Sequence, residues 1–208
     1  MLVIGVMMEQ KDLCVGKKVI LVVAGQGFDF DEYQITKDML QRVGVKVITA
    51  SNKNGGAVAQ DKRTTLVDIH LNNIKLSDYD GIFFIGGLGV VKIPESESPH
   101  EGLNAQNCLD IPISYGLIAQ AKKLDIPYGA IGMAVRILVK GYGLQGKAAT
   151  GWNGDLALTP MLLFFGGKDK IDHEMVVNDF VVTARDASAS ALFADGIIRV
   201  LRKKALGA

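Results

Sequence analysis

The chain has 208 residues, of which 49% are hydrophobic, and it carries 23 Lys and Arg against 22 Asp and Glu. This length predicts one medium-sized domain with a full hydrophobic core, and the near balance of charge argues against a nucleic-acid-binding protein. The two cysteines and three histidines do not have the spacing of a disulfide framework or a metal site, so we expect neither metal nor cofactor. The composition is typical of a protein from the reduced cytoplasm.

The first eight residues, Met1 to Met8, form an apolar run that Glu9 follows at once. A secretory signal has a positive start and a small-residue cleavage site, and a membrane span needs about 20 apolar residues. Because neither pattern is met, we expect no membrane contact, an N-terminal extension at residues 1–17 and the domain at residues 18–208. A leader, a start-site artefact and a short additional strand remain open for the extension.

A strand–helix–strand unit opens the domain. Val19 to Ala24 is a continuous apolar run, typical of a strand that is buried on both faces of a parallel sheet. Residues 25–27 predict a strand-to-helix turn, and the acidic residues that follow it favour the start of a helix. Gly44 is expected to end that helix, and residues 45–50 predict the next strand.

The middle of the chain predicts another buried strand and then a long connection. Residues 51–65 are polar and contain glycine, which predicts a loop or a small hairpin. Residues 80–85 predict a buried strand that Gly86 and Gly87 close. Residues 88–110 are irregular, and a connection of this length inside a domain is usually a lid or an insertion.

The last part of the chain continues the alternation of strands and helices. We expect helices at 113–124, 132–138 and 187–203, and strands at 127–131, 147–150 and on both sides of 178–179. The alternation predicts a doubly wound, flavodoxin-like α/β fold in a single domain, with a mostly parallel sheet between two layers of helices.

Ligands of open parallel sheets bind at the carboxyl ends of the strands. Three predicted strand ends carry glycine-rich turns: 25–27, which Glu32 follows, then 86–87 and 132–133. We expect these ends to converge on one pocket that binds a small molecule. Trp152 follows another predicted strand and is expected either to wall this pocket or to pack at a surface.

The order and spacing of these pieces resemble the ThiJ/PfpI family, which belongs to the class I glutamine amidotransferase-like superfamily and includes the parkinsonism-associated deglycase. The resemblance extends over roughly residues 17–202. It rests on the first strand with its acidic turn, on residues 40–51, on the strand at 78–87 with Ile85 in place of a proline, and on the closing strand and helix at 180–201. It implies the flavodoxin-like fold and a homodimer.

The resemblance also shows what this chain lacks. The family's reactive cysteine lies on an elbow between a strand and a helix, where this sequence has Gly132 followed by Met133. Glycine has no nucleophile, and a thioether does not form a thiolate. The histidine that some members carry falls near Gly151, so that partner is missing too. Neither Cys14 nor Cys108 takes the elbow position, and we expect both to be unreactive.

The resemblance therefore implies a pseudoenzyme that binds a small molecule or has a chaperone-like or stress-related role. The alternative is a glyoxalase, deglycase or hydrolase-type enzyme in which Glu32 is the general base and the Gly86 and Gly87 amides hold an oxyanion. Without such a role, Glu32 is an acid that complements the helix dipole. A peptidase is the weakest reading, and nucleotide binding at residues 25–30 is disfavoured because the third glycine is missing and acids crowd the helix start.

Overall fold

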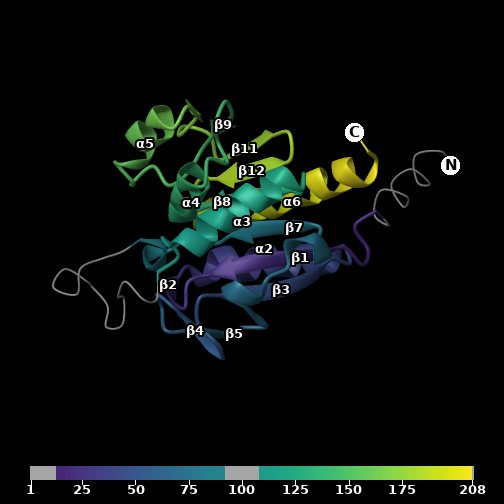
Figure 1. Cartoon of the computed structure of the whole chain (residues 1–208). Helices are drawn as coiled ribbons and strands as arrows, with labels where there is room; N and C mark the ends of the chain where they lie inside the picture. Colours follow the sequence, from purple (N-terminus) through teal and green to yellow (C-terminus); the bar gives the residue numbers. More distant parts are fainter. Residues whose placement is uncertain (1–12, 92–107, 208) are drawn as a thin grey trace.

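A seven-stranded sheet forms the core of the computed structural model, which describes residues 13–91 and 108–207 (Figure 1). The strand order is β11–β12–β8–β7–β1–β3–β6, and every neighbouring pair is parallel except β11 with β12. The strands are β1 (Lys18–Val23), β3 (Lys46–Ser51), β6 (Ile69–His70), β7 (Gly81–Phe84), β8 (Tyr128–Ile131), β11 (Met175–Asn178) and β12 (Val181–Ala184). This doubly wound α/β topology confirms the predicted fold class.

Strand β1 lies in the interior of the sheet because its side chains are apolar on both faces. All its residues after Lys18 are fully buried. Ile20 lies opposite Ile48 of β3 on one side and Ile82 of β7 on the other. Helices cover both faces of such a strand, so a continuous apolar run marks it rather than an alternating pattern.

Two layers of helices cover the sheet. On one face α2 (Phe30–Arg42) packs against α6 (Ser190–Ala205), and on the other α3 (Pro112–Lys123) packs against α4 (Val135–Lys140) (Figure 1). A further helix, α5 (Leu158–Phe164), packs against α4 and was not predicted from the sequence. Short 3₁₀ helices are η1 (Leu71–Asn73), η2 (Leu76–Asp78), η3 (Leu88–Val90), η5 (Gly132–Ala134) and η6 (Ala187–Ala189).

Two small sheets complete the described fold. One contains β2 (Gln26–Phe28), β4 (Gly56–Ala59) and β5 (Thr64–Leu66), and in the other β9 (Ala148–Ala149) pairs with β10 (Lys168–Asp169). Strands β4 and β5 are antiparallel, as expected for the small hairpin. The prediction of a plain turn at 25–27 is wrong, because this segment pairs with β4 some 30 residues later in the chain.

Part of the predicted N-terminal extension, from residue 13 onward, lies within the described structure. Cys14 is fully buried, and its Sγ lies 3.9 Å from the carbonyl oxygen of Ile198 on α6. The N–H of Gly16 donates to the carbonyl of Gly44 at 2.9 Å. Chain before β1 therefore packs onto the domain. Residues 1–12 and most of the predicted insertion, including His100, lie outside the described residues.

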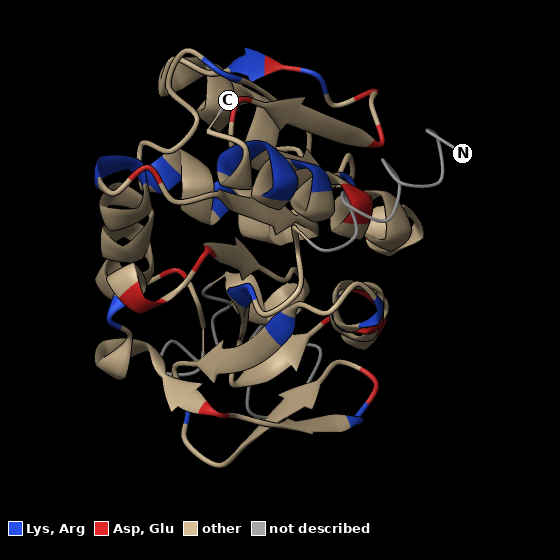
Figure 2. Cartoon of the chain, turned by 90° about the vertical axis from the view of Figure 1, so that its right-hand side faces the viewer, with Lys and Arg blue, Asp and Glu red and all other residues tan. Residues whose placement is uncertain are grey.

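Charged side chains of both signs share the surface. In Figure 2, Lys and Arg segments lie among Asp and Glu segments across the side shown, in keeping with the near balance of charge. Lys147 pairs with Asp179 at 2.5 Å, and Lys204 pairs with Asp125. Within residues 13–91 and 108–207, every helix is too short or too polar to span a membrane.

Candidate functional site

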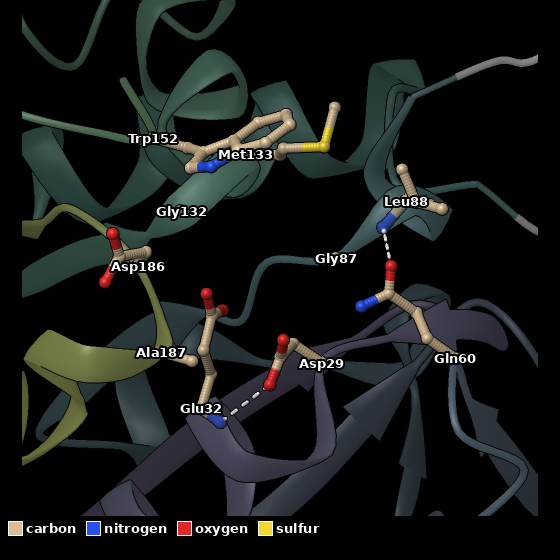
Figure 3. A pocket seen from close by; sticks show the side chains of 10 residues that line it. All are labelled: Asp29, Glu32, Gln60, Gly87, Leu88, Gly132, Met133, Trp152, Asp186 and Ala187. Carbon is tan, nitrogen blue, oxygen red and sulfur yellow. Dashed lines mark hydrogen bonds between the residues drawn. The ribbon is translucent and has the colours of Figure 1, made fainter. Parts of the chain in front are cut away.

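A pocket of about 290 Å³ opens at the carboxyl edge of the sheet (Figure 3). The segments that follow β1, β7 and β8 meet there, so Glu32, Gly87 and Gly132 lie in one pocket, as the argument from strand ends predicts. The described residues that line it are Asp29, Glu32, Gln60, Gly87, Leu88, Gly132, Met133, Trp152, Asp186 and Ala187.

Gly132 forms the elbow between β8 and the helical turn that leads into α4. Its φ of 62° lies in the left-handed region that favours glycine. A Cβ atom built on Gly132 would lie 2.6 Å from Oε1 of Glu32. The sharp turn is therefore present with a carboxyl group beside it, while the side chain that would act as the nucleophile is missing.

The first turn of α2 places Glu32 in the pocket. Oδ1 of Asp29 caps the helix by accepting the N–H groups of Asp31 and Glu32, both at 3.0 Å. Oε2 of Glu32 accepts the N–H of Gly86 at 2.7 Å, and the N–H of Asp29 donates to the carbonyl of Gly86 at 2.9 Å. These bonds tie the start of α2 to the end of β7.

Burial raises the pKa of Glu32 well above its ordinary value, and the nearby charges of Asp29 and Asp186 raise it further. The hydrogen bond from Gly86 opposes this shift only in part. Glu32, which is 4% exposed, therefore holds its proton into a pH range where an exposed glutamate is ionised. In that state the carboxyl group can donate a hydrogen bond as well as accept one.

The Glu32→Gln variant is expected to gain stability relative to the wild type as the pH rises towards about 8. The folded-state pKa is raised, so the wild type loses stability as the pH rises from the unfolded-state value near 4.3 towards the folded-state value. Glutamine does not titrate, so the two proteins should differ less near about pH 4 than near about pH 8. Chemical unfolding at several pH values measures this difference. Asp38→Asn, on the same helix but outside the pocket, is the control, and a difference that does not change with pH would contradict the expectation.

The two glycines after β7 differ in their surroundings. The N–H of Gly86 already donates to Glu32, so this amide is not free to hold an oxyanion, and Gly86 is absent from the pocket lining among the described residues. Gly87 lines the pocket with a φ of 108°, and a Cβ atom there would lie 2.5 Å from the backbone nitrogen of Asp29. Of the predicted pair, only Gly87 faces the pocket directly.

Trp152 lines the pocket opposite the acids and is 37% exposed. The loop that carries it is held by a partly buried ion pair that the sequence analysis missed. Arg136 on α4 binds both carboxylate oxygens of Asp155, with Nε at 2.5 Å from Oδ2. The N–H of Asp155 donates to the carbonyl of Trp152 at 3.0 Å. The pair therefore connects the pocket wall to the helix that follows the elbow.

Asp186 is a second acid that the sequence analysis missed. It follows β12 and caps η6 by accepting the N–H of Ser188 at 3.0 Å, and Arg185 donates to its other oxygen at 3.1 Å. Burial acts to raise the pKa of Asp186, but the hydrogen bonds from Ser188 and Arg185 outweigh it and lower the pKa. The position of Asp186 directly before a predicted helix was the sequence signal that could have identified it as a helix cap. No group of three or more His, Cys, Asp or Glu side chains suited to a metal ion occurs in the described part of the chain.

Both cysteines lie in the interior, and neither is among the described residues that line the pocket. Burial raises the pKa of Cys14 despite the nearby charges of Arg202 and Lys17.

We expect iodoacetamide to label Cys14 and Cys108 in the folded protein more slowly than it labels a cysteine in a short peptide. After unfolding, both residues should react at the rate of the peptide cysteine. Mass spectrometry of timed samples measures both rates. Fast labelling of Cys108 in the folded state would contradict this expectation and would favour an enzyme that uses Cys108 as its nucleophile.

A family model described as the DJ-1/PfpI family matches residues 17–200. The chain belongs to this family. Similar solved structures include a ThiJ/PfpI domain protein from Brachyspira murdochii, at 21% identity and a TM-score of 0.76, over 90% of this chain and 99% of that one. DJ-1beta from Drosophila melanogaster is 20% identical with a TM-score of 0.72, over 92% of this chain and 94% of that one.

DJ-1 from Schizosaccharomyces pombe is 18% identical, with a TM-score of 0.69 over 91% of this chain and 97% of that one. Comparison with curated proteins returns no match. At these identities the structures establish the fold of this DJ-1/PfpI member. Its pocket has to be interpreted from its own residues, above all from the glycine at the elbow.

Proposed function

We propose that this DJ-1/PfpI chain binds a small molecule in the sheet-edge pocket and carries out no thiol chemistry there. One observation carries the proposal: the elbow and its carboxyl group are present, but the elbow residue is Gly132. The roles of the pocket residues, Met133 and Trp152 among them, are part of this proposal.

The shape and lining of the pocket support binding. Its volume of about 290 Å³ is at the small end of the range for ligand sites, which suits a compact ligand. Leu88, Met133 and Trp152 supply apolar surface, and carboxyl groups supply polar contacts. Such a mixture of apolar walls and a few convergent polar groups is typical of small-molecule sites.

Binding can be followed with Trp152, which is the one tryptophan in the sequence. We expect planar aromatic fragments of about ten heavy atoms to change its emission, with dissociation constants on the order of 1 mM. Ala187→Phe, which fills the pocket, should abolish the change, while Ala191→Phe on the exposed side of α6 should preserve it. Fragments that fail to bind, or that still bind to Ala187→Phe, would rule out this site.

The enzyme alternative has one observation in its favour. A protonated Glu32 beside the elbow is suited to general acid catalysis on a small carbonyl compound, rather than to the general-base role expected from the sequence. The occupied Gly86 amide weakens it, because one of the two expected oxyanion donors is taken. Consumption of glyoxal that Glu32→Gln slows by about 100-fold would favour this alternative over simple binding.

We also propose a cytoplasmic homodimer with a chaperone-like or stress-related role. Two buried cysteines without a disulfide suit a reducing compartment. Tyr142, Leu163 and Phe164 expose more than half of their surfaces, and the Tyr142 and Phe164 rings both contact Phe165. Such an apolar surface suits a contact between copies. Light scattering should give a dimer for the wild type and a monomer for Phe164→Glu, whereas a monomeric wild type would contradict the proposal.

A further inference from the structure

The pocket is lined by acidic residues and has no formal positive charge among the described residues. Asp29, Glu32 and Asp186 line it, while the lining contains no Lys, Arg or His within residues 13–91 and 108–207. The side-chain N–H donors of the described lining come from Gln60 and Trp152, and both are uncharged. An anionic ligand would therefore lack an ion-pair partner in this part of the pocket.

Two carboxyl oxygens point into the pocket without a partner in the described structure. Oδ1 of Asp29 accepts two helix N–H groups, which leaves Oδ2 free, and Figure 3 shows that oxygen directed at the cavity. Oε2 of Glu32 accepts the Gly86 N–H, which leaves Oε1 free beside the elbow. Glu32 is more than nine-tenths buried, so its free oxygen has the pocket itself as its source of hydrogen-bonding partners.

Two positive groups of the described structure beside the pocket residues are already occupied. The N-terminus of α2 would attract an anion, but the Asp29 side chain takes the N–H groups of Asp31 and Glu32. Arg185, which is not among the described lining residues, binds the Asp186 and Glu174 carboxylates at 3.1 and 3.3 Å. These pairings leave the Asp29 and Glu32 carboxyl groups as the polar groups that face the ligand at the start of α2.

The opposite wall of the pocket is apolar and polarisable. Figure 3 shows Trp152 and Met133 across the cavity from Asp29 and Glu32. The face of an indole ring attracts cations, and a thioether packs well against flat rings. A ligand in this cavity therefore meets carboxyl oxygens at one end and an aromatic surface at the other.

We propose that the pocket binds a small organic cation whose planar N–H donor group, an amidinium or guanidinium, faces Asp29 and Glu32 while its flat apolar body packs on Trp152 and Met133. A planar fork of N–H donors matches two neighbouring carboxyl oxygens better than a single ammonium does. This inference rests on the proposed binding function and names its ligand class.

Benzamidine, benzamide and benzoate test the inference, because they share size and shape and are positive, neutral and negative near neutral pH. Isothermal titration calorimetry should give at least about tenfold tighter binding for benzamidine than for benzamide, and the weakest binding for benzoate. Asp29→Asn should remove most of the preference for benzamidine, because it weakens benzamidine binding far more than benzamide binding. Asparagine is also a good helix N-cap, so this variant keeps the fold, and Asp38→Asn on the same helix is the matched control.

Each outcome decides one of the two proposals. Failure of all three probes to bind would overturn the binding function itself. Equal binding of the three probes, or tighter binding of benzoate, would overturn the cation inference and leave the binding function standing. A preference for benzamidine that survives Asp29→Asn would show that the acids at the start of α2 do not select the ligand, and it would overturn the inference as well.

Discussion

Replacing Gly87 by alanine is expected to lower the free energy of unfolding by about 3 kcal/mol or more. The residue has a φ of 108°, which disfavours any side chain. Its Cβ would also lie 2.5 Å from the nitrogen of Asp29 and 2.6 Å from the carbonyl oxygen of Gly27. The nitrogen is at the start of α2 and the oxygen is in β2, and backbone atoms cannot swing away as the end of a side chain can. Relief of the contact therefore requires the end of β7 to move away from β2 and the start of α2.

Gly146→Ala separates the cost of the positive φ from the cost of the close Cβ contact. Gly146 has a φ of 73°, but a Cβ there meets nothing within 4 Å, so this variant carries only the conformational cost of about 1–2 kcal/mol. Urea unfolding of both variants measures the difference. Equal losses of stability for Gly87→Ala and Gly146→Ala would show that the close approach behind the pocket is looser than the structure indicates.

A cysteine placed at the elbow is expected to recover an activated thiol. In Gly132→Cys, the new side chain precedes a helix and lies beside Glu32, whose pKa is raised by burial. A carboxyl group that keeps its proton can donate to a thiolate, whereas an ionised one would repel it. We expect the alkylation rate to reach its midpoint at least about one pH unit below the free-cysteine value of about 8.5.

The same substitution carries a cost in stability. At a φ of 62° a side chain is strained by about 1–2 kcal/mol, and the new Cβ pushes on Oε1 of Glu32. Gly132→Ala has the same Cβ without the thiol and therefore isolates this cost. Removing the neighbouring side chain in Gly132→Cys with Met133→Ala gives the thiol more room. A midpoint at or above about 8.5 in both cysteine variants would show that the elbow no longer activates a thiol.

The fold and the position of the pocket follow largely from the sequence. Continuous apolar runs such as Val19 to Ala24 mark strands that are buried on both faces, because both faces of a parallel sheet are covered. The order of these runs gives a doubly wound sheet, and its ligands bind at the carboxyl ends of the strands. Glu32, Gly87 and Gly132 each follow a strand, so their meeting in one pocket was predictable from local pattern and topology.

The chemistry of the pocket depends on contacts between segments that are far apart in the chain. Only the folded structure shows that Glu32 accepts the N–H of Gly86. The same is true of the ion pair of Arg136 with Asp155, which holds the loop of Trp152. The same holds for the strand at 26–28, which needs β4 as its partner. Hydrogen bonds and burial of this kind leave no periodic trace in a sequence, because they depend on distances in space. The sequence by itself therefore determined the scaffold and the missing nucleophile, and the tertiary structure decided which polar groups remain free to meet a ligand.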